Sequence, residues 1–150
     1  MALKNKWIFI LTALILAGCT VLGGGAEPTA EAQSLANTSW MLVSYGPADA
    51  PTEVAPGSQV TLQFEGETNA GGSAGCNSYG GQYQQQGSTV SFNEVVSTLM
   101  ACADAAVMEQ ETQFLTALQT TGEFELSGDS LTIFYNNGQD ALNFNRAPAQ

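Results

Sequence analysis

The residues of this 150-residue chain best able to carry chemistry are three cysteines, Cys19, Cys76 and Cys102. The chain contains no histidine, so neither a Ser-His nor a Cys-His nucleophile pair can form. Histidine zinc sites are excluded for the same reason, and three thiols cannot make a four-cysteine site. Lipid attachment and disulfide formation are therefore the cysteine chemistry to consider first.

The segment before Cys19 is typical of a secretion signal. Lys4 and Lys6 make a positive start, and the apolar run 7–17 follows them. As a helix this run would rise only about 16 Å, against a bilayer core of about 30 Å. It suits the core of a signal peptide better than a membrane span, and a buried N-terminal helix is the alternative.

The apolar run ends in Leu16-Ala17-Gly18-Cys19, which resembles the bacterial lipobox. The Cys19 sulfur would take a diacylglyceryl group, cleavage would follow Gly18, and the new amino group would be acylated. Two or more acyl chains hold a protein stably on a membrane, whereas one binds only marginally. We therefore expect residues 1–18 to be a lipoprotein signal peptide and Cys19 to anchor the chain to a membrane.

This anchor predicts a place in the cell envelope, outside the cytoplasm. Thr20 follows the cysteine, and it is not the Asp that resembles an inner-membrane retention signal. In a cell with two membranes we therefore expect the outer one, and otherwise the outer face of the cell membrane.

The charge of the mature chain is strongly negative. All 14 acidic residues follow Cys19, whereas Lys4 and Lys6 would leave with the signal peptide and only Arg146 would remain basic. The formal excess is thirteen negative charges, which repels phosphates, so we expect no nucleic-acid partner.

Carboxylates are the remaining candidates for catalysis. Glu65 and Glu67 flank a predicted turn, and Glu109 and Glu111 lie two apart on a predicted helix, so they point in different directions. A two-carboxylate hydrolase needs a facing pair across a cleft, which no pattern here indicates. The segment 136–140 imitates a calcium loop only weakly and fits a hairpin turn better. We expect no catalytic residue, no cofactor and no metal.

Period-two alternation of apolar and polar residues predicts several short strands. They fall around 40–45, 60–64, 79–83, 90–92, 124–126, 131–135 and 142–144. Proline and glycine predict a loop over 46–57.

One helix is predicted to begin at the N-cap Asp104 and to end at Gly122 as its C-cap. This order predicts a mainly β fold with one α-helix, a small antiparallel barrel or strongly curled sheet closed by the helix. Residues 19–36 are expected to be the lipidated N-terminus and a flexible tether, 37–146 the folded domain, and 147–150 a polar tail.

Three segments resemble the META domain, which occurs in bacterial heat-shock lipoproteins. They are the entry strand Thr38–Leu42, the run Gly75–Tyr83 (G-C-N-x-Y-x-G-x-Y) and the run Ser97–Cys102 (S-T-x-M-A-C). The resemblance implies a small lipocalin-like barrel with a helix. It brings no established catalytic residue and no defined ligand, and it links the chain loosely to envelope stress and drug tolerance.

The motif residues are interpreted as structural. Trp40, Tyr79 and Tyr83 are expected in the core or its rim rather than in a ligand cage, and Met100 is expected to fill core space. Asn77 is expected to bond local backbone in a turn, and the motif glycines Gly75, Gly80 and Gly81 are expected to let the chain bend.

Cys76 and Cys102 are an even pair in an exported domain and predict a disulfide. Two reduced, buried thiols are the alternative.

Three functions remain open from the sequence. The first is a non-catalytic envelope lipoprotein that acts as a stress-related structural or interaction module. The second is a binding module that holds a small apolar ligand or a peptide in the barrel mouth. The third is a carboxylate-dependent hydrolase. The partner, whether protein or small molecule, stays unknown at this stage.

Overall fold

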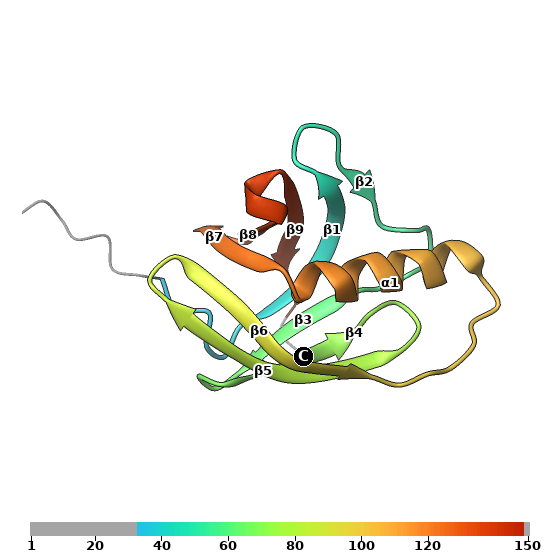
Figure 1. The fold of residues 1–150 in the computed structure, drawn as a ribbon, viewed down its shortest axis with the longest axis horizontal. Coiled ribbons are helices and arrows are strands. Elements are labelled where there is room, and N and C mark those ends of the chain that lie inside the picture. The colour runs from blue at the N-terminus through green and yellow to red at the C-terminus, as the bar shows by residue number, and fades with distance from the viewer. Residues whose placement is uncertain (1–32, 149–150) are drawn as a thin grey trace, which may run out of the picture.

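The computed structural model describes residues 33–148. The predicted signal peptide, Cys19 and most of the predicted tether lie outside the described residues. The strands and helices follow one another along the chain as Figure 1 shows. They are β1 (Ser39–Pro47), β2 (Thr52–Glu53), β3 (Thr61–Glu65), β4 (Asn69–Ser73), β5 (Ser78–Gln86), β6 (Thr89–Ser97), α1 (Ala105–Leu118), β7 (Thr121–Ser127), β8 (Ser130–Tyr135), the 3-10 turn η1 (Asn136–Gly138) and β9 (Asp140–Arg146).

Eight of the strands form a closed antiparallel barrel. From β3 to β9 each strand pairs with the next, β3 also pairs with β1, and β1 pairs with β9 to close the ring. The two-residue strand β2 pairs with β1 only. The predicted fold class, mainly β with an antiparallel barrel and one helix, is confirmed.

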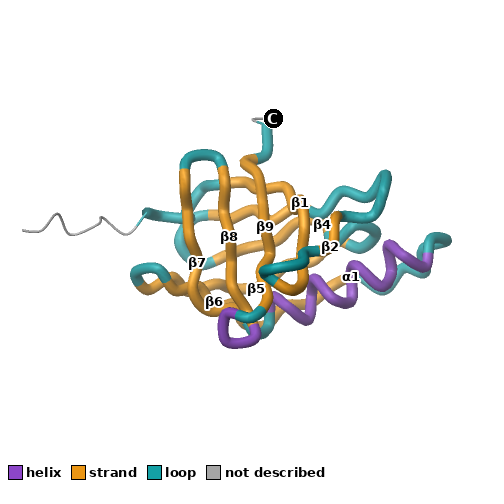
Figure 2. The backbone as a smooth tube through the Cα atoms, turned by 90° about the horizontal axis from the view of Figure 1, so that it is seen from above, coloured by secondary structure: helices purple, strands orange, loops and turns teal. Residues whose placement is uncertain are grey.

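The seam between β6 and β7 is the weakest part of the ring. One residue pair, Thr89–Glu123, joins the two strands, and the Phe124 amide donates to the Ser88 carbonyl at 2.7 Å. In Figure 2, helix α1 runs from near one end of β9 toward the side of the molecule that carries β1, β2 and β4. One face of the helix is buried against the barrel core. No helix within residues 33–148 has the length and apolar character needed to cross a bilayer.

Side chains fill the barrel interior. Alternation along β1 and β3 sends Trp40, Leu42, Leu62 and Phe64 inward, as a half-buried strand requires. Phe114 of α1 is fully buried and meets the ring of Tyr79 edge-on. The helix therefore completes the core that the strands begin.

One of the two predicted caps of α1 is confirmed and the other is wrong. The Asp104 side chain accepts hydrogen bonds from the amides of Ala106 and Val107, so the predicted N-cap is confirmed. The predicted C-cap, Gly122, is wrong, because the helix ends at Leu118 and Gly122 lies in β7. The hydroxyls of Thr120 and Thr121 instead donate to the last helical carbonyls, which leaves no need for a glycine there.

Core packing begins before the expected boundary at Asn37. Leu35 is fully buried in the barrel core. Its amide donates to the Gln85 side chain, whose amide group in turn donates to the Gln33 carbonyl. At the other end, the Ala147 amide donates to the Ser39 carbonyl. A lone leucine in a polar segment has no period to reveal it, which is why the sequence assigned Leu35 to the tether.

Replacing Leu35 with alanine should therefore weaken the domain. A fully buried leucine truncated to alanine typically costs about 2–5 kcal/mol of unfolding free energy. Leu99→Ala is the matched control, because Leu99 is 95% exposed, and it should change stability by less than about 0.5 kcal/mol. Urea denaturation of the mature chain measures both. Equal midpoints for the two variants would show that Leu35 belongs to the tether.

Candidate functional site

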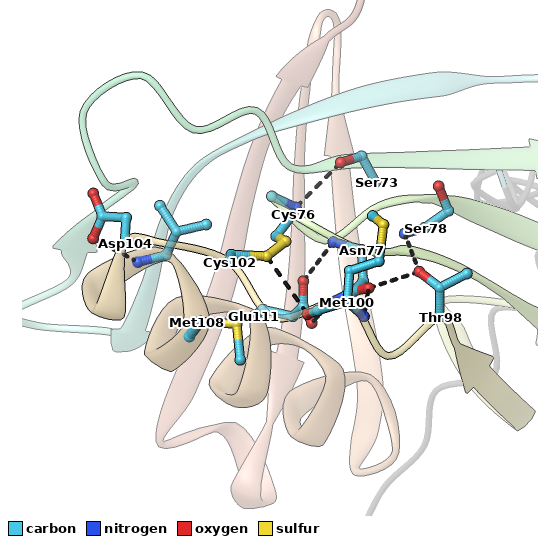
Figure 3. The surroundings of a disulfide bond; sticks show 12 residues. Ser73, Cys76, Asn77, Ser78, Thr98, Met100, Cys102, Asp104, Met108 and Glu111 are labelled. Atoms are coloured by element: carbon cyan, nitrogen blue, oxygen red, sulfur yellow. Dashed lines mark hydrogen bonds between the residues drawn. A yellow bond between two sulfur atoms is a disulfide. The ribbon is translucent and has the colours of Figure 1, made fainter.

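Two of the motif segments, far apart in sequence, meet beside the helix. They are the turn before β5, residues 74–77, and the loop 98–104 between β6 and α1. Cys76 and Cys102 form a disulfide between these segments, with their Cα atoms 6.4 Å apart and a sequence separation of 26 residues. Figure 3 shows the bridge next to Asn77, Met100 and Glu111.

Asn77 holds the loop in place from a buried position. Its side-chain oxygen accepts hydrogen bonds from the Met100 amide at 2.8 Å and from the Thr98 hydroxyl at 2.7 Å. Its side-chain nitrogen donates to the Met100 carbonyl at 3.2 Å and to Glu111 at 2.7 Å. The expectation of local turn bonds is wrong for this side chain. The Asn77 backbone carbonyl already closes the turn with the Ala74 amide, which leaves the side chain free for distant partners.

Sequence analysis considered Glu111 only as a candidate catalytic carboxylate and missed its structural role. Its carboxylate is buried and accepts two hydrogen bonds from Asn77, at 2.8 Å from the backbone amide and 2.7 Å from the side chain. Glu111 lies at a position of the apolar stripe of α1 (Val107, Glu111, Phe114, Leu118). The sequence signal for this role is an acidic residue on the apolar face of the predicted helix.

Two motif glycines allow close backbone approach. Gly75 adopts φ +113°, and a Cβ there would lie 2.7 Å from the Ser58 hydroxyl and 3.1 Å from the Gln110 side chain. Gly81 faces a bulge in β6, where a Cβ would lie 2.9 Å from the Asn93 carbonyl. A larger residue at Gly75 would be strained by the positive φ, whereas at Gly81 it would collide with the backbone of β6.

The motif aromatics are buried and hydrogen-bonded. The Tyr79 hydroxyl donates to the Thr61 carbonyl at 2.8 Å, the Tyr83 hydroxyl to the Gly66 carbonyl at 2.7 Å, and the Trp40 indole to the Thr38 hydroxyl at 2.7 Å. Burial raises the pKa of the Tyr79 phenol, so this group stays neutral and remains a donor. These three rings line the core and do not form an open cage.

Met100 does not fill core space, contrary to expectation. Its side chain is 58% exposed, and the neighbouring Leu99 is 95% exposed. The Met100 backbone is bonded to Asn77 through both its amide and its carbonyl, and this geometry turns the side chain outward. Large apolar side chains held outward by a rigid loop are a feature of interaction sites.

A groove of about 460 Å³ lies between this loop and α1. We call it the β6–α1 groove. It is lined by Asn77, Ser97, Leu99, Met100, Ala101, Met108, Glu111, Thr112, Leu115, Thr116 and Gln119. Glu111 contributes the one ionisable side chain of this lining. Across residues 33–148, no three cysteine or acidic side chains converge to hold a metal.

The META domain family matches residues 33–148. This match covers most of the chain and includes every motif segment described above. The chain belongs to the META domain family. The Asn77–Glu111 contact and the Cys76–Cys102 bridge therefore lie in its META domain.

Solved structures share the fold. A protein from Burkholderia xenovorans, with a structure determined by NMR, is 30% identical and aligns with a TM-score of 0.65 over 77% of this chain and 85% of that chain. A DUF4847 family protein from Bacteroides vulgatus, with a crystal structure, is 14% identical and aligns with a TM-score of 0.55 over 77% and 96% of the two chains. The second likeness concerns the fold alone. No curated protein matches the chain in sequence.

The Asn77–Glu111 contact should contribute measurably to stability. Glu111→Gln replaces one acceptor oxygen with an NH2 donor, which would face one of the two Asn77 donors. Leaving such a buried group unpaired costs about 1–3 kcal/mol. Glu109→Gln is the matched control, since Glu109 lies exposed on the same helix and should cost less than about 0.5 kcal/mol. Chemical denaturation of both variants tests this prediction. An equal loss of unfolding free energy in the two variants would mean that the change in net charge, and not the contact with Asn77, causes the effect.

Breaking the disulfide should also destabilise the domain. The double variant Cys76→Ser, Cys102→Ser should lose about 3–4 kcal/mol of unfolding free energy, because the bridge restricts the unfolded chain. The intact mass before and after reduction, with thiol alkylation, shows whether the bridge forms. Two thiols that alkylate without reductant in a folded sample would rule it out.

Proposed function

We propose that this chain is a non-catalytic lipoprotein of the cell envelope whose META domain serves as an interaction module in a stress-related role. The observation that carries the proposal is the pair of exposed apolar side chains, Leu99 and Met100, on a loop fastened by a disulfide and by Asn77. A surface of this kind suits contact with another molecule more than catalysis.

The filled barrel interior supports surface contact over a ligand in the barrel mouth. Phe64 packs edge-on against Tyr83, and Phe114 occupies the end that α1 covers. The buried carboxylate supports the same conclusion. Both Glu111 oxygens are engaged by Asn77, so this group is committed to holding the loop.

The lipidated anchor on Cys19 remains part of the proposal. The lipobox-like segment 16–19 and the short apolar run before it support it. An anchored domain with a strong negative charge stays clear of anionic headgroups, which would leave its interaction surface accessible.

Complementation of a deletion strain under envelope stress, such as heat or antibiotic challenge, tests the three parts of the proposal together. Cys19→Ala removes the acceptor sulfur and should abolish both lipidation and rescue. Leu99→Ser removes the exposed side chain and should reduce rescue. Glu65→Gln, a change at an exposed carboxylate, should rescue like the wild type. Mass spectrometry of the mature N-terminus confirms the anchor.

Two results would contradict this proposal. An unmodified mature chain that begins elsewhere than Cys19 would remove the anchor. Full rescue by Leu99→Ser, combined with loss of rescue in Glu65→Gln at normal protein levels, would revive the hydrolase function.

A further inference from the structure

We propose that the β6–α1 groove binds an extended, basic and apolar peptide segment of a partner protein as a strand added to the free edge of β6. This inference rests on the proposed function as an interaction module and specifies the partner for the same surface.

The first support is the unpaired edge of β6. The strand pairs with β5 from Thr89 to Ser97, whereas its pairing with β7 is confined to Thr89. Within residues 33–148 no other strand pairs with β6. An edge with free amide and carbonyl groups is a template for strand addition. Glu94 adopts a positive φ and lies in a β-bulge of β6, which interrupts the regular strand. The regular part of the free edge near the groove is therefore residues 95–97.

The second support is the length of the groove. Its wall on α1 extends from Met108 to Gln119, which corresponds to about 16 Å of helix. An extended chain rises about 3.3 Å per residue, so about five residues would fill this wall. Opposite α1, the wall is made by Ser97 at the end of β6 and by the loop residues 99–101. An extended peptide could therefore meet the end of the free edge with its backbone and the loop and helix with its side chains.

The third support is the apolar, rigid lining. Leu99, Met100, Ala101, Met108 and Leu115 line the groove. The disulfide and Asn77 fix the loop that carries the first three. A surface held in its binding conformation loses little conformational entropy on association, and the two methionines can adapt to several apolar side chains.

The fourth support is the sign of the charge. Arg146 is the one basic residue among residues 33–148, and it pairs with Asp129 at 2.9 Å and stacks over Trp40. No basic residue lines the groove, and the exposed Glu94 lies on β6. Glu111 is already bonded to Asn77, so the attraction comes from the acidic surface of the domain. A partner segment with lysine or arginine is therefore favoured. A second copy of this acidic chain is disfavoured by like-charge repulsion.

Peptide binding to the mature lipidated chain in detergent micelles tests the proposal. The probe is a fluorescent peptide of about nine residues with alternating lysine and valine, which places valine toward the groove and lysine away from it. We expect fluorescence anisotropy to detect binding, and hydrogen exchange to slow within the free edge, residues 95–97. Leu99→Ser should weaken binding at least tenfold, and so should methylation of alternate peptide nitrogens.

Val43→Ser is the matched control, because Val43 is 44% exposed on β1 and does not line the groove. It should leave the affinity unchanged. Equal affinities for wild type, Leu99→Ser and Val43→Ser would mean general attraction to an acidic surface and would overturn the proposal. So would unchanged binding of the methylated peptide, or absence of binding.

Self-association of the chain would be recognised by a dependence of hydrogen exchange on protein concentration. If rising protein concentration alone slowed exchange at residues 95–97, a second copy would be the occupant and the peptide proposal would fail. The proposed function is judged separately by the complementation. Rescue that depends on Leu99, without peptide binding in micelles, would refute the peptide and leave the interaction module intact.

Discussion

The hydrogen bonds between Glu111 and Asn77 are the constraint on which the rest of this surface depends. A buried carboxylate is costly to desolvate unless its oxygens accept hydrogen bonds. Here no cation serves that purpose, since the one basic residue of the described chain is paired elsewhere. Asn77 supplies both donors, so α1 can settle into the barrel only where this side chain meets it. Helix position and loop position are thus set by one pair of residues.

The disulfide and Gly75 also hold the turn 74–77 against the loop 98–104 and the helix, each in a different way. The bridge from Cys76 acts covalently on the loop, one residue away from the side chain that holds it by hydrogen bonds. Gly75 lets the turn approach Gln110, which is itself buried and bonded to the Ala55 amide and the Ser58 hydroxyl. The result is a loop with little freedom that nevertheless exposes two large apolar side chains. Folding gains little from such exposure, and this is why we propose that these side chains contact another molecule.

The incomplete seam of the barrel explains why a helix and a free edge lie together. β6 and β7 separate after a single residue pair, and α1 closes the opening with Phe114 and Leu118 instead of with backbone pairing. The helix supplies side chains that fill the hydrophobic core, but its backbone does not pair with that of β6. A bulge at Glu94 shortens the exposed edge and places a charge on it, and natural sheets use both devices to avoid uncontrolled association. The groove is thus a consequence of how the barrel closes.

The sequence by itself determined the fold class, the family resemblance, the helix start at Asp104 and the pairing of the two domain cysteines. These follow from local patterns: period-two alternation, a capping residue, and two thiols in one domain. Only the tertiary structure decided that Leu35 is core, that Met100 points outward, and that Asn77 bonds to Glu111 and to the loop rather than to its own turn. Each of these depends on partners more than 20 residues away, and such partners meet only when the strands close into a ring and α1 packs against it.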